Sequence, residues 1–363
     1  MSKVNLCDIC DFQGGSQPPK SQWITLQQDG YIRMLQIRDF TQPGKVKAEY
    51  VKLTNTTKCC LKDDILIARY GASLGKILTG LSGAYNVAMT KAVPNEAVIS
   101  KKFLYYFLCS DTFQNCILNV GVRAAQAGFN KEDLSNIELY CPDLSIQNKI
   151  CKILELVDVL INKSKLQLDE LDLLVKSRFI EMFGDPVTNE KGWVKVRLAD
   201  KCCIITGNTP PRANEKYYGS YIEWIKSDNI TSSMYLTKAA EYLSEEGLAV
   251  GKKVESGSVL MTCIAGSLKS IGNVAIADRP VTFNQQINAV VTNEQNTLFM
   301  YEQFKLTKEY ITCDVNMALK GILSKGQLSE KQFIFPPIEL QNQFADFVAQ
   351  VDKSKFVVTA KFQ

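Results

Sequence analysis

The chain of 363 residues contains no histidine. Imidazole is the usual general base near neutral pH and a common metal ligand, so its absence excludes serine–histidine and cysteine–histidine catalysis and most catalytic metal sites. The chain also has no run of about 18 apolar residues, which a membrane-spanning helix needs, and no apolar stretch of signal-peptide length near its N-terminus. We therefore expect a soluble protein of the cytoplasm that does not contact a membrane.

The twelve cysteines do not suggest a disulfide framework, because they are a small share of a long chain and stand singly or in adjacent pairs such as Cys59-Cys60. Cys7 and Cys10 have the spacing of half a zinc site. In the second copy of the repeat described below, Ala199 stands at the position of Cys7, so this spacing is not repeated. We expect reduced thiols, no metal site and no cofactor.

Motifs for nucleotide binding and methyl transfer are missing as well. The segment 71–76 resembles part of a phosphate-binding loop, but its glycines are too close together for G-x-x-x-x-G-K-[ST], and Ile77 follows the lysine. The proline pairs that begin at Pro18 and Pro336 lack the flanking residues that resemble the base-holding motif of amino-methyltransferases. The sequence therefore predicts a protein without catalytic residues of its own.

A long internal repeat is the main positive feature of the sequence. The pair Pro18-Pro19 recurs as Pro210-Pro211, an offset of 192 positions (210 − 18), and Tyr85-Asn86 recurs as Phe283-Asn284. Each copy closes with the same series, Leu134, Pro142, Gln147-Asn148 and Asp158 in the first and Leu328, Pro336, Gln341-Asn342 and Asp352 in the second. So long a period predicts duplication of a domain-sized unit rather than a solenoid. The length and the ordinary composition, 46% hydrophobic and 22% charged, also suggest about two globular domains.

Both halves begin with short segments typical of strands, separated by glycine, proline and asparagine clusters. The expected strands are 31–37, 64–69, 221–226 and 258–264. Helical periodicity follows over 101–118 in the first copy and over 298–311 in the second. These segments predict a mixed α/β (α+β) domain in each half.

Each half then ends in a longer amphipathic segment. From Ile146 to Phe179 apolar residues recur at steps of three and four, which predicts a helix on the order of 55 Å long that stops near Gly184 and Pro186. The same spacing from Leu340 onward predicts a shorter helix of roughly 24 residues. Two helices with apolar stripes bury them most economically against each other, so we expect an antiparallel, coiled-coil-like pair that separates the two domains. The alternative is that the first helix packs only on its own domain.

Repeated loops in both halves combine small residues with Lys, Arg, Asn and Gln. Gly and Ser let the backbone approach a phosphate, Lys and Arg neutralise it, and Arg, Asn and Gln can read base edges. The net charge of +4 permits nucleic acid without requiring it. For any single residue, a solvated turn is an equally good interpretation. The candidate DNA-binding residues are Lys20, Arg38, Arg69, Lys76, Arg123, Arg212, Lys216, Lys226, Lys269, Gln285 and Lys325.

Several short sequence segments, taken in their order along the chain, resemble one protein family over almost the whole length. They are Arg178 to Pro186, Trp193 to Asp200, Thr206 to Pro211, Ile222 to Ile225 and Pro336 to Gln341. Together they resemble the specificity subunit of type I restriction-modification systems. The resemblance implies a first target recognition domain over residues 1–142, a central spacer helix over 143–185, a second recognition domain over 186–336 and a C-terminal spacer helix over 337–363.

The resemblance also implies what the chain does and what it binds. Each recognition domain would read one half of a split site on double-stranded DNA, and the helices would set the distance between the half-sites. Two methyltransferase subunits and a restriction and translocase subunit would be the partners that methylate adenine and cut, while this chain would direct them without catalysis. Two other interpretations stay open, a duplicated interaction adaptor that binds no DNA and an unrecognised enzyme. Salt-dependent binding to duplex DNA distinguishes a DNA reader from an adaptor.

The second helix is shorter than the family's second spacer helix, which usually matches the first in length. A helix of this length is marginal on its own, so extending it beyond Gln363 is expected to raise the thermal midpoint. Scanning calorimetry of the extended and original chains measures this, and an unchanged midpoint would contradict the expectation.

Overall fold

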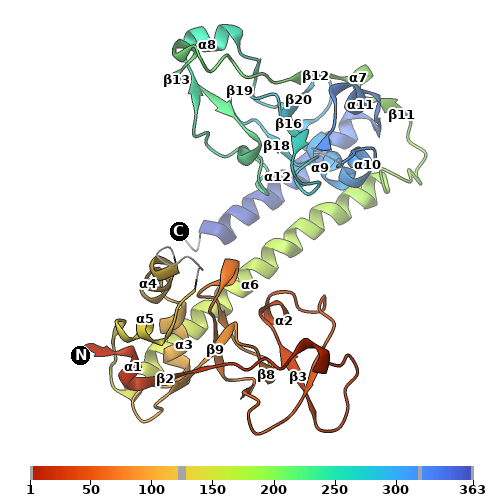
Figure 1. Cartoon of the computed structure of the whole chain (residues 1–363). Coiled ribbons are helices and arrows are strands. Elements are labelled where there is room, and N and C mark those ends of the chain that lie inside the picture. The colour runs from red at the N-terminus through yellow and green to blue at the C-terminus, as the bar shows by residue number, and fades with distance from the viewer. Residues whose placement is uncertain (1–2, 122–127, 318–320, 361–363) are drawn as a thin grey trace. The chain divides into compact units, whose positions relative to one another are not determined.

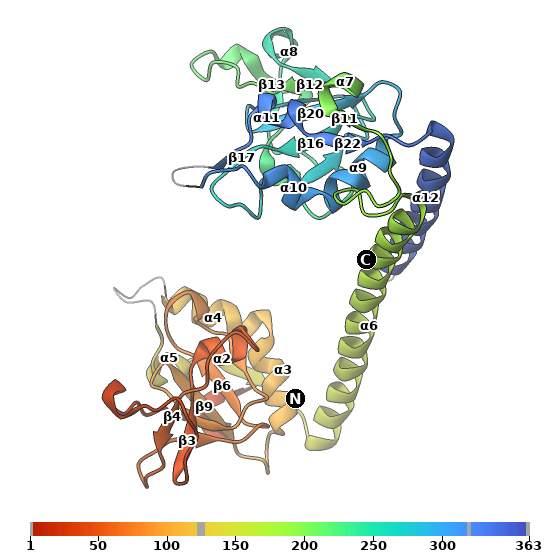
Figure 2. The ribbon, with the colours of Figure 1, turned by 90° about the vertical axis from the view of Figure 1, so that its right-hand side faces the viewer.

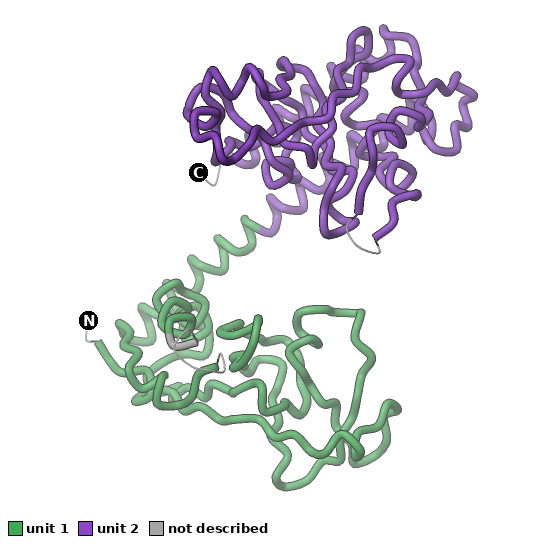
Figure 3. The backbone as a smooth tube through the Cα atoms, turned by 45° about the horizontal axis from the view of Figure 1, so that its top comes forward, with its two compact units in different colours: residues 1–161 green, residues 162–363 purple. Residues whose placement is uncertain are grey.

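A computed structural model of the chain describes residues 3–121, 128–317 and 321–360 (Figure 1). The chain forms two compact units, residues 1–161 and 162–363 (Figure 3). The boundary lies within helix α6, Leu144–Phe183, so the first part of this helix belongs to the first unit and the remainder to the second. In the described part of the chain, no helix has the length and apolar character needed to cross a membrane.

The first unit contains two four-stranded sheets and a separate strand pair. One sheet has the order β2 (Cys10–Gly14), β9 (Met89–Pro94), β6 (Ile65–Ala68) and β7 (Ile77–Leu78). The other has the order β4 (Tyr50–Lys52), β3 (Tyr31–Leu35), β8 (Gly83–Tyr85) and β5 (Cys59–Cys60), and β1 (Lys3–Asn5) pairs with β10 (Glu138–Tyr140). In the second sheet, β3 and β8 are parallel, whereas the neighbours of β3 and β8 at the edges are antiparallel to them.

The second unit repeats this topology. Its sheets have the orders β12 (Cys202–Thr206), β20 (Ile287–Thr292), β16 (Val259–Thr262), β18 (Val274–Ile276), and β14 (Tyr242–Leu243), β13 (Tyr218–Ile225), β19 (Val281–Phe283), β15 (Lys253–Val254). The pair β11 (Lys195–Arg197) and β22 (Gln332–Ile334) corresponds to β1 and β10, while β17 (Ile264–Ala265) pairs with β21 (Gly321–Ile322). Strands β13 and β19 are parallel, as β3 and β8 are. The predicted duplication of a mixed α/β domain with a long central helix is therefore confirmed.

Helices cover the sheets and connect them. In the first unit they are α1 Leu6–Ile9, α2 Ile37–Thr41, α3 Lys101–Cys109, α4 Asp111–Gly121, α5 Lys131–Ser135 and the 3-10 turns η1 Lys20–Gln22 and η2 Gly71–Ser73. In the second unit they are α7 Leu198–Lys201, α8 Glu245–Val250, α9 Thr297–Leu306, α10 Lys308–Thr312, α11 Lys325–Glu330, α12 Ile338–Ala360 and the turns η3 Glu215–Tyr217 and η4 Ser227–Asn229.

The structure divides each of the two shorter expected helices. The segment 101–118 breaks at Ser110, whose backbone is extended (φ −72°, ψ 153°), and the side chain of Gln114 donates to the carbonyl of Leu108 at 2.7 Å to cap the end of α3. The segment 298–311 breaks at Thr307, between α9 and α10. The expected strand 31–37 is also too long, because a capping box formed by Gln36 and Asp39 starts α2.

Two repeated glycines are explained by a close backbone approach. A Cβ atom on Gly15 would lie 2.1 Å from the carbonyl oxygen of Asn86, and one on Gly207 would lie 2.2 Å from that of Asn284. Both distances are far below van der Waals contact, so only glycine fits. The contact brings two separate blocks of the sequence repeat together in each unit.

A buried glutamine anchors the start of each long helix. The side chain of Gln147 accepts from the Ser100 amide at 2.9 Å and donates to the Pro142 carbonyl at 2.7 Å. Gln341 accepts from the Asn296 amide at 3.0 Å and donates to the Pro336 carbonyl at 2.8 Å. Each glutamine therefore ties the helix to the strand before it and to the N-cap of a second helix.

Within the second unit, α6 runs beside α12 (Figures 1 and 2). The Phe179 ring lies 5.3 Å from the Phe344 ring, and Asp172 on α6 pairs with Lys355 on α12 at 2.6 Å. Residue numbers rise on α6 as they fall on α12, so the two helices are antiparallel here. Phe299 of α9 stacks on Phe179 at 5.5 Å, which joins three helices in one buried aromatic cluster.

We predict that Phe344→Ala lowers the free energy of unfolding by about 3–5 kcal/mol, because it leaves a cavity among these rings. Phe356→Ala is the matched control on the same helix, since Phe356 is 71% exposed, and it is expected to change stability by less than about 0.5 kcal/mol. Urea unfolding followed by circular dichroism measures both. Equal effects of the two changes would contradict a core role for the cluster.

Candidate nucleic-acid interface

In the second unit, two of the predicted DNA-binding residues share one carboxylate. Arg212 Nη1 lies 2.7 Å from Glu241 Oε2, and Lys226 Nζ pairs with the other oxygen of the same group. The Arg212 guanidinium carbon is 4.5 Å from the centre of the Tyr218 ring and 4.9 Å from that of Trp224. Cations over aromatic faces are attracted by the ring quadrupole. These five residues form what we name the second cation cluster.

Two side chains of strand β13 hydrogen-bond to the backbone of the loop that carries Arg212. The Tyr218 hydroxyl donates to the Pro210 carbonyl at 2.6 Å, and Trp224 Nε1 donates to the Asn208 carbonyl at 3.2 Å. Both aromatic residues belong to β13. The rings therefore hold the backbone on each side of Thr209 while they lie under the guanidinium.

Neighbouring cations keep Glu241 ionised. Lys226, and after it Arg212, lowers the pKa of this carboxyl below its ordinary value. Two cations and one carboxylate give the cluster a net charge of +1. The Arg212 side chain is still 54% exposed, and since guanidinium has five N–H donors, donors remain free for a ligand.

The first unit contains a matching group. Lys20 Nζ lies 3.8 Å from the centre of the Trp23 ring and 2.6 Å from Glu49 Oε1. Arg38 Nη2 and Gln36 Nε2 both lie 3.0 Å from Glu49 Oε2. The hydrogen bond with Lys20 is the main cause that lowers the pKa of Glu49. We name these five residues the first cation cluster.

The two clusters are equivalent in sequence and in backbone geometry. Glu49 and Glu241 stand 192 positions apart (241 − 49), the same offset as Lys20 and Arg212. The carbonyl of Glu49 accepts from the Met34 amide at 2.8 Å on β3, and that of Glu241 accepts from the Trp224 amide at 3.0 Å on β13. Trp23 Nε1 donates to the Pro18 carbonyl at 3.0 Å, the counterpart of the bond from Tyr218 to Pro210. The duplication therefore includes the cluster.

The carboxylates and rings of the clusters were not among the candidates predicted from the sequence. Those candidates were cations and one amide, since only such groups were expected to meet phosphate or base edges. A usable signal was present, because Ala48-Glu49-Tyr50 recurs as Ala240-Glu241-Tyr242 at the offset of the proline pairs. The aromatic residues could not be found from the repeat. Trp23 and Tyr218 bond to the equivalent carbonyls of Pro18 and Pro210, but they do not occupy equivalent positions in the two copies of the sequence.

The remaining predicted residues lie outside these clusters. Arg69 Nε and Nη2 each lie 3.4 Å from the Phe129 carbonyl, so this side chain holds a neighbouring loop. Gln285 is exposed and bonds to the Thr209 hydroxyl beside the second cluster. Four lysines are exposed and make no ion pair within the described part of the chain, namely Lys76, Lys216, Lys269 and Lys325. Arg123 lies outside the described residues.

An ion pair supports the strand beneath the second cluster. Arg279 donates to both carboxylate oxygens of Glu223, at 2.8 Å each, and Glu223 also accepts from the Ala239 amide at 2.7 Å. The hydrogen bond with Arg279 is the main cause that lowers the pKa of Glu223. Since Glu223 precedes Trp224 on β13, this pair fixes the strand next to the stacked ring.

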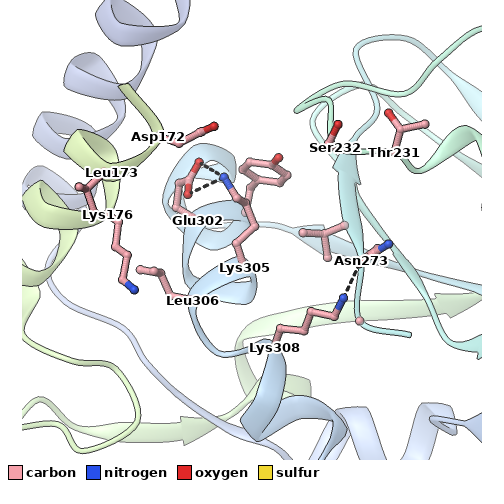
Figure 4. A pocket seen from close by; sticks show the side chains of 13 residues that line it. Asp172, Leu173, Lys176, Thr231, Ser232, Asn273, Glu302, Lys305, Leu306 and Lys308 are labelled. Atoms are coloured by element: carbon pink, nitrogen blue, oxygen red, sulfur yellow. Dashed lines mark hydrogen bonds and ion pairs between the residues drawn. The ribbon is translucent and has the colours of Figure 1, made fainter. Parts of the chain in front are cut away.

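A separate hollow of about 710 Å³ lies in the second unit, beside α6 and α9 (Figure 4). None of the candidate residues lines it. Glu302 pairs there with Lys305, and burial raises the pKa of Glu302 while it lowers that of Lys308. The hollow thus contains charges of both signs.

Among the described residues, the cysteines and acidic side chains were compared with the requirements of a metal centre. All twelve cysteines are free thiols. Residues 3–121, 128–317 and 321–360 contain no group of three or more His, Cys, Asp or Glu side chains placed to hold a metal ion.

The fold is that of a tandem-domain protein, in which each unit contains one cation cluster. The family model described as the type I restriction modification DNA specificity domain matches the chain twice, over residues 1–171 and 190–361. The chain belongs to this family.

Similar proteins agree with this assignment. The HindI specificity subunit of Haemophilus influenzae is 31% identical over 118 residues, 32% of this chain and 25% of that protein. The MjaIX specificity subunit of Methanocaldococcus jannaschii is 21% identical over 282 residues, 72% of this chain and 65% of that protein. The chain thus spans less than two thirds of either curated relative. The S subunit of a type I system from M. genitalium has the same fold, with a TM-score of 0.56 at 15% identity over 99% of this chain and 91% of that one.

We predict a pH-dependent contribution from Glu223. Its folded pKa is below the unfolded value of roughly 4.3, so the stabilisation is complete above that value and is lost as the pH falls through the folded pKa. Glu223→Gln should lower stability by about 2 kcal/mol at pH 7, with the gap to the unmodified chain closing below about pH 4.

Urea midpoints of both chains, measured from about pH 7 down to about pH 3.5, test this prediction, because the lower part of this interval covers the titration of a carboxyl group. Glu255→Gln is the matched control, because Glu255 pairs with Lys253 but its side chain is 68% exposed. A gap for Glu223→Gln that stays constant with pH would contradict the assigned cause.

Proposed function

We propose that this chain is the DNA specificity subunit of a type I restriction-modification complex. The observation that carries the proposal is the duplicated cation cluster, which occurs once in each unit of a chain whose family is a DNA specificity domain. Each cluster offers an exposed guanidinium group, that of Arg38 on α2 in the first unit and that of Arg212 on its loop in the second. Such donors bind phosphate oxygens and base edges.

Two units with equivalent loops support a bipartite target. In this proposal the first unit reads one half-site and the second unit reads the other. The cations that differ between the units, Lys20 against Arg212, allow the half-sites to differ in sequence, because guanidinium contacts guanine bidentately whereas ammonium acts as a point charge.

The proposed partners are two methyltransferase subunits and a restriction and translocase subunit, and helix α6 offers an apolar surface on which a methyltransferase subunit could dock. In the described structure the α6 side chains Ile153, Leu156 and Leu160 are 62%, 64% and 56% exposed. Exposed apolar patches of this kind mark protein interaction sites. A methyltransferase subunit that docks there would supply the adenine methylation that this chain lacks residues to perform.

The first test of the proposal measures salt-dependent binding to duplex DNA. A DNA reader releases counterions for each phosphate contact, so Lys76→Ala should reduce the slope of log affinity against log salt by about 0.9, and both Lys76→Ala and Arg212→Ala should weaken binding. Lys163→Ala on α6 removes the same charge from an exposed position outside the loops and serves as control. Absence of any salt-dependent binding would favour an interaction adaptor.

The second test is co-expression with the cognate methyltransferase subunit in a host free of adenine methylation, followed by sequencing of modified adenines. We expect a two-part motif with a fixed gap. A motif with a single continuous part would contradict the assignment of one half-site to each unit, and no motif despite co-purification of the subunits would contradict the proposed function.

A further inference from the structure

Each cation cluster contains a carboxylate at a surface proposed to meet DNA. Glu49 and Glu241 lie within hydrogen-bond distance of the cations that would contact DNA. A carboxylate repels phosphate, so its presence lowers the general affinity for nucleic acid. Because a carboxylate nevertheless occurs at the same position in both units, we look for a role that does not depend on attracting DNA by charge.

We propose that Glu49 and Glu241 are positioning residues, each of which fixes one guanidinium and one ammonium group for the half-site read by its own unit. This inference rests on the proposed function. In each unit the carboxylate then helps to determine specificity without touching DNA, because it acts through the cations that it holds.

The geometry of the second cluster explains how positioning works. Arg212 has three restraints, a carboxylate at 2.7 Å and two aromatic rings at 4.5 and 4.9 Å. A free arginine side chain loses about 2 kcal/mol of rotamer entropy when it is ordered. Here the order exists before the ligand arrives, so less is lost on binding. A planar fork held in one orientation also rejects bases whose acceptors do not match it.

The first cluster preserves this chemistry with different residues. The guanidinium comes from Arg38 on α2 and the ammonium from Lys20 at the start of η1, whereas in the second unit the guanidinium comes from Arg212 on the loop before η3. In both units the carboxylate binds the ammonium group through Oε1 and the guanidinium group through Oε2. One carboxylate oxygen per cation is thus a shared feature of both units.

Positioning and simple electrostatics lead to opposite expectations for Glu241→Gln. If charge alone matters, the cluster goes from +1 to +2 and affinity rises equally for target and unrelated DNA. If Glu241 positions Arg212, affinity for unrelated DNA rises or stays the same, while affinity for the target falls. The ratio of the two affinities therefore separates the explanations.

The experiment uses the full chain co-expressed with its methyltransferase subunit. Sequencing of modified adenines gives the motif, and binding to a duplex with that motif is compared with binding to a scrambled duplex. Glu241→Gln is expected to lower the affinity ratio about tenfold and to relax the motif only in the half-site of the second unit. Glu49→Gln is expected to relax only the other half-site.

Matched controls remove a paired, exposed carboxylate elsewhere in each unit. Glu330→Gln breaks a pair with Arg197 in the second unit, and Glu138→Gln breaks a pair with Lys3 in the first. Both should leave the motif and the affinity ratio unchanged. Arg212→Lys keeps the charge but loses the planar fork, so it should lower the ratio as Glu241→Gln does, and the double variant should be no worse than either single variant.

The outcomes are distinguishable. A higher affinity for both duplexes with an unchanged ratio would overturn the positioning role and leave the proposed function intact. Relaxation of both half-sites by one substitution would overturn the assignment of each carboxylate to its own unit. No two-part motif from the unmodified chain would overturn the proposed function itself. If Glu241→Gln lowers the thermal midpoint, the double variant decides: an affinity ratio no lower than that of Arg212→Lys alone supports positioning, and a lower ratio overturns it.

Discussion

The buried glutamine at the start of each long helix is the contact on which the arrangement within each unit depends. Gln147 and Gln341 are almost fully inaccessible, and each satisfies both ends of its amide with neighbouring groups. Leaving such a group unpaired costs about 1–3 kcal/mol, so helix, strand end and neighbouring N-cap must meet in one register. The sheets and their loops are then placed relative to a fixed helix start, and equivalent loops take equivalent positions in both units.

The sequence predicted the features that depend on local pattern or on repetition. The duplication followed from the order of repeated blocks, and the extent of α6 followed from the spacing of Ile146 to Phe179. The break at Ser110 was not predictable, because the apolar periodicity continues through it and the cap comes from Gln114. Four of the candidate cations were brought together in pairs, but the reason lies in Glu49 and Glu241, which only tertiary structure places beside them.

The clusters also show how a chain of modest net charge can concentrate positive charge locally. The whole chain has a net charge of +4, and each cluster alone has +1. Exposed cations elsewhere include some that pair with acids, as Arg197 does with Asp200 and Glu330, and some, such as Lys76, that make no ion pair among the described residues. Local arrangement therefore matters more than overall composition for where a polyanion would bind, and this is why composition alone left the question open.

The close approach at Gly15 and Gly207 has a consequence for protein engineering. Each glycine marks the point where a sheet strand ends and the loop with the proline pair begins, and no side chain fits there. A library that varies residues 208–217 but keeps Gly207, Tyr218 and Glu241 would change the chemistry of the loop without moving its two ends. The repeat thus outlines a replaceable segment between invariant anchors, available independently in either half of the chain.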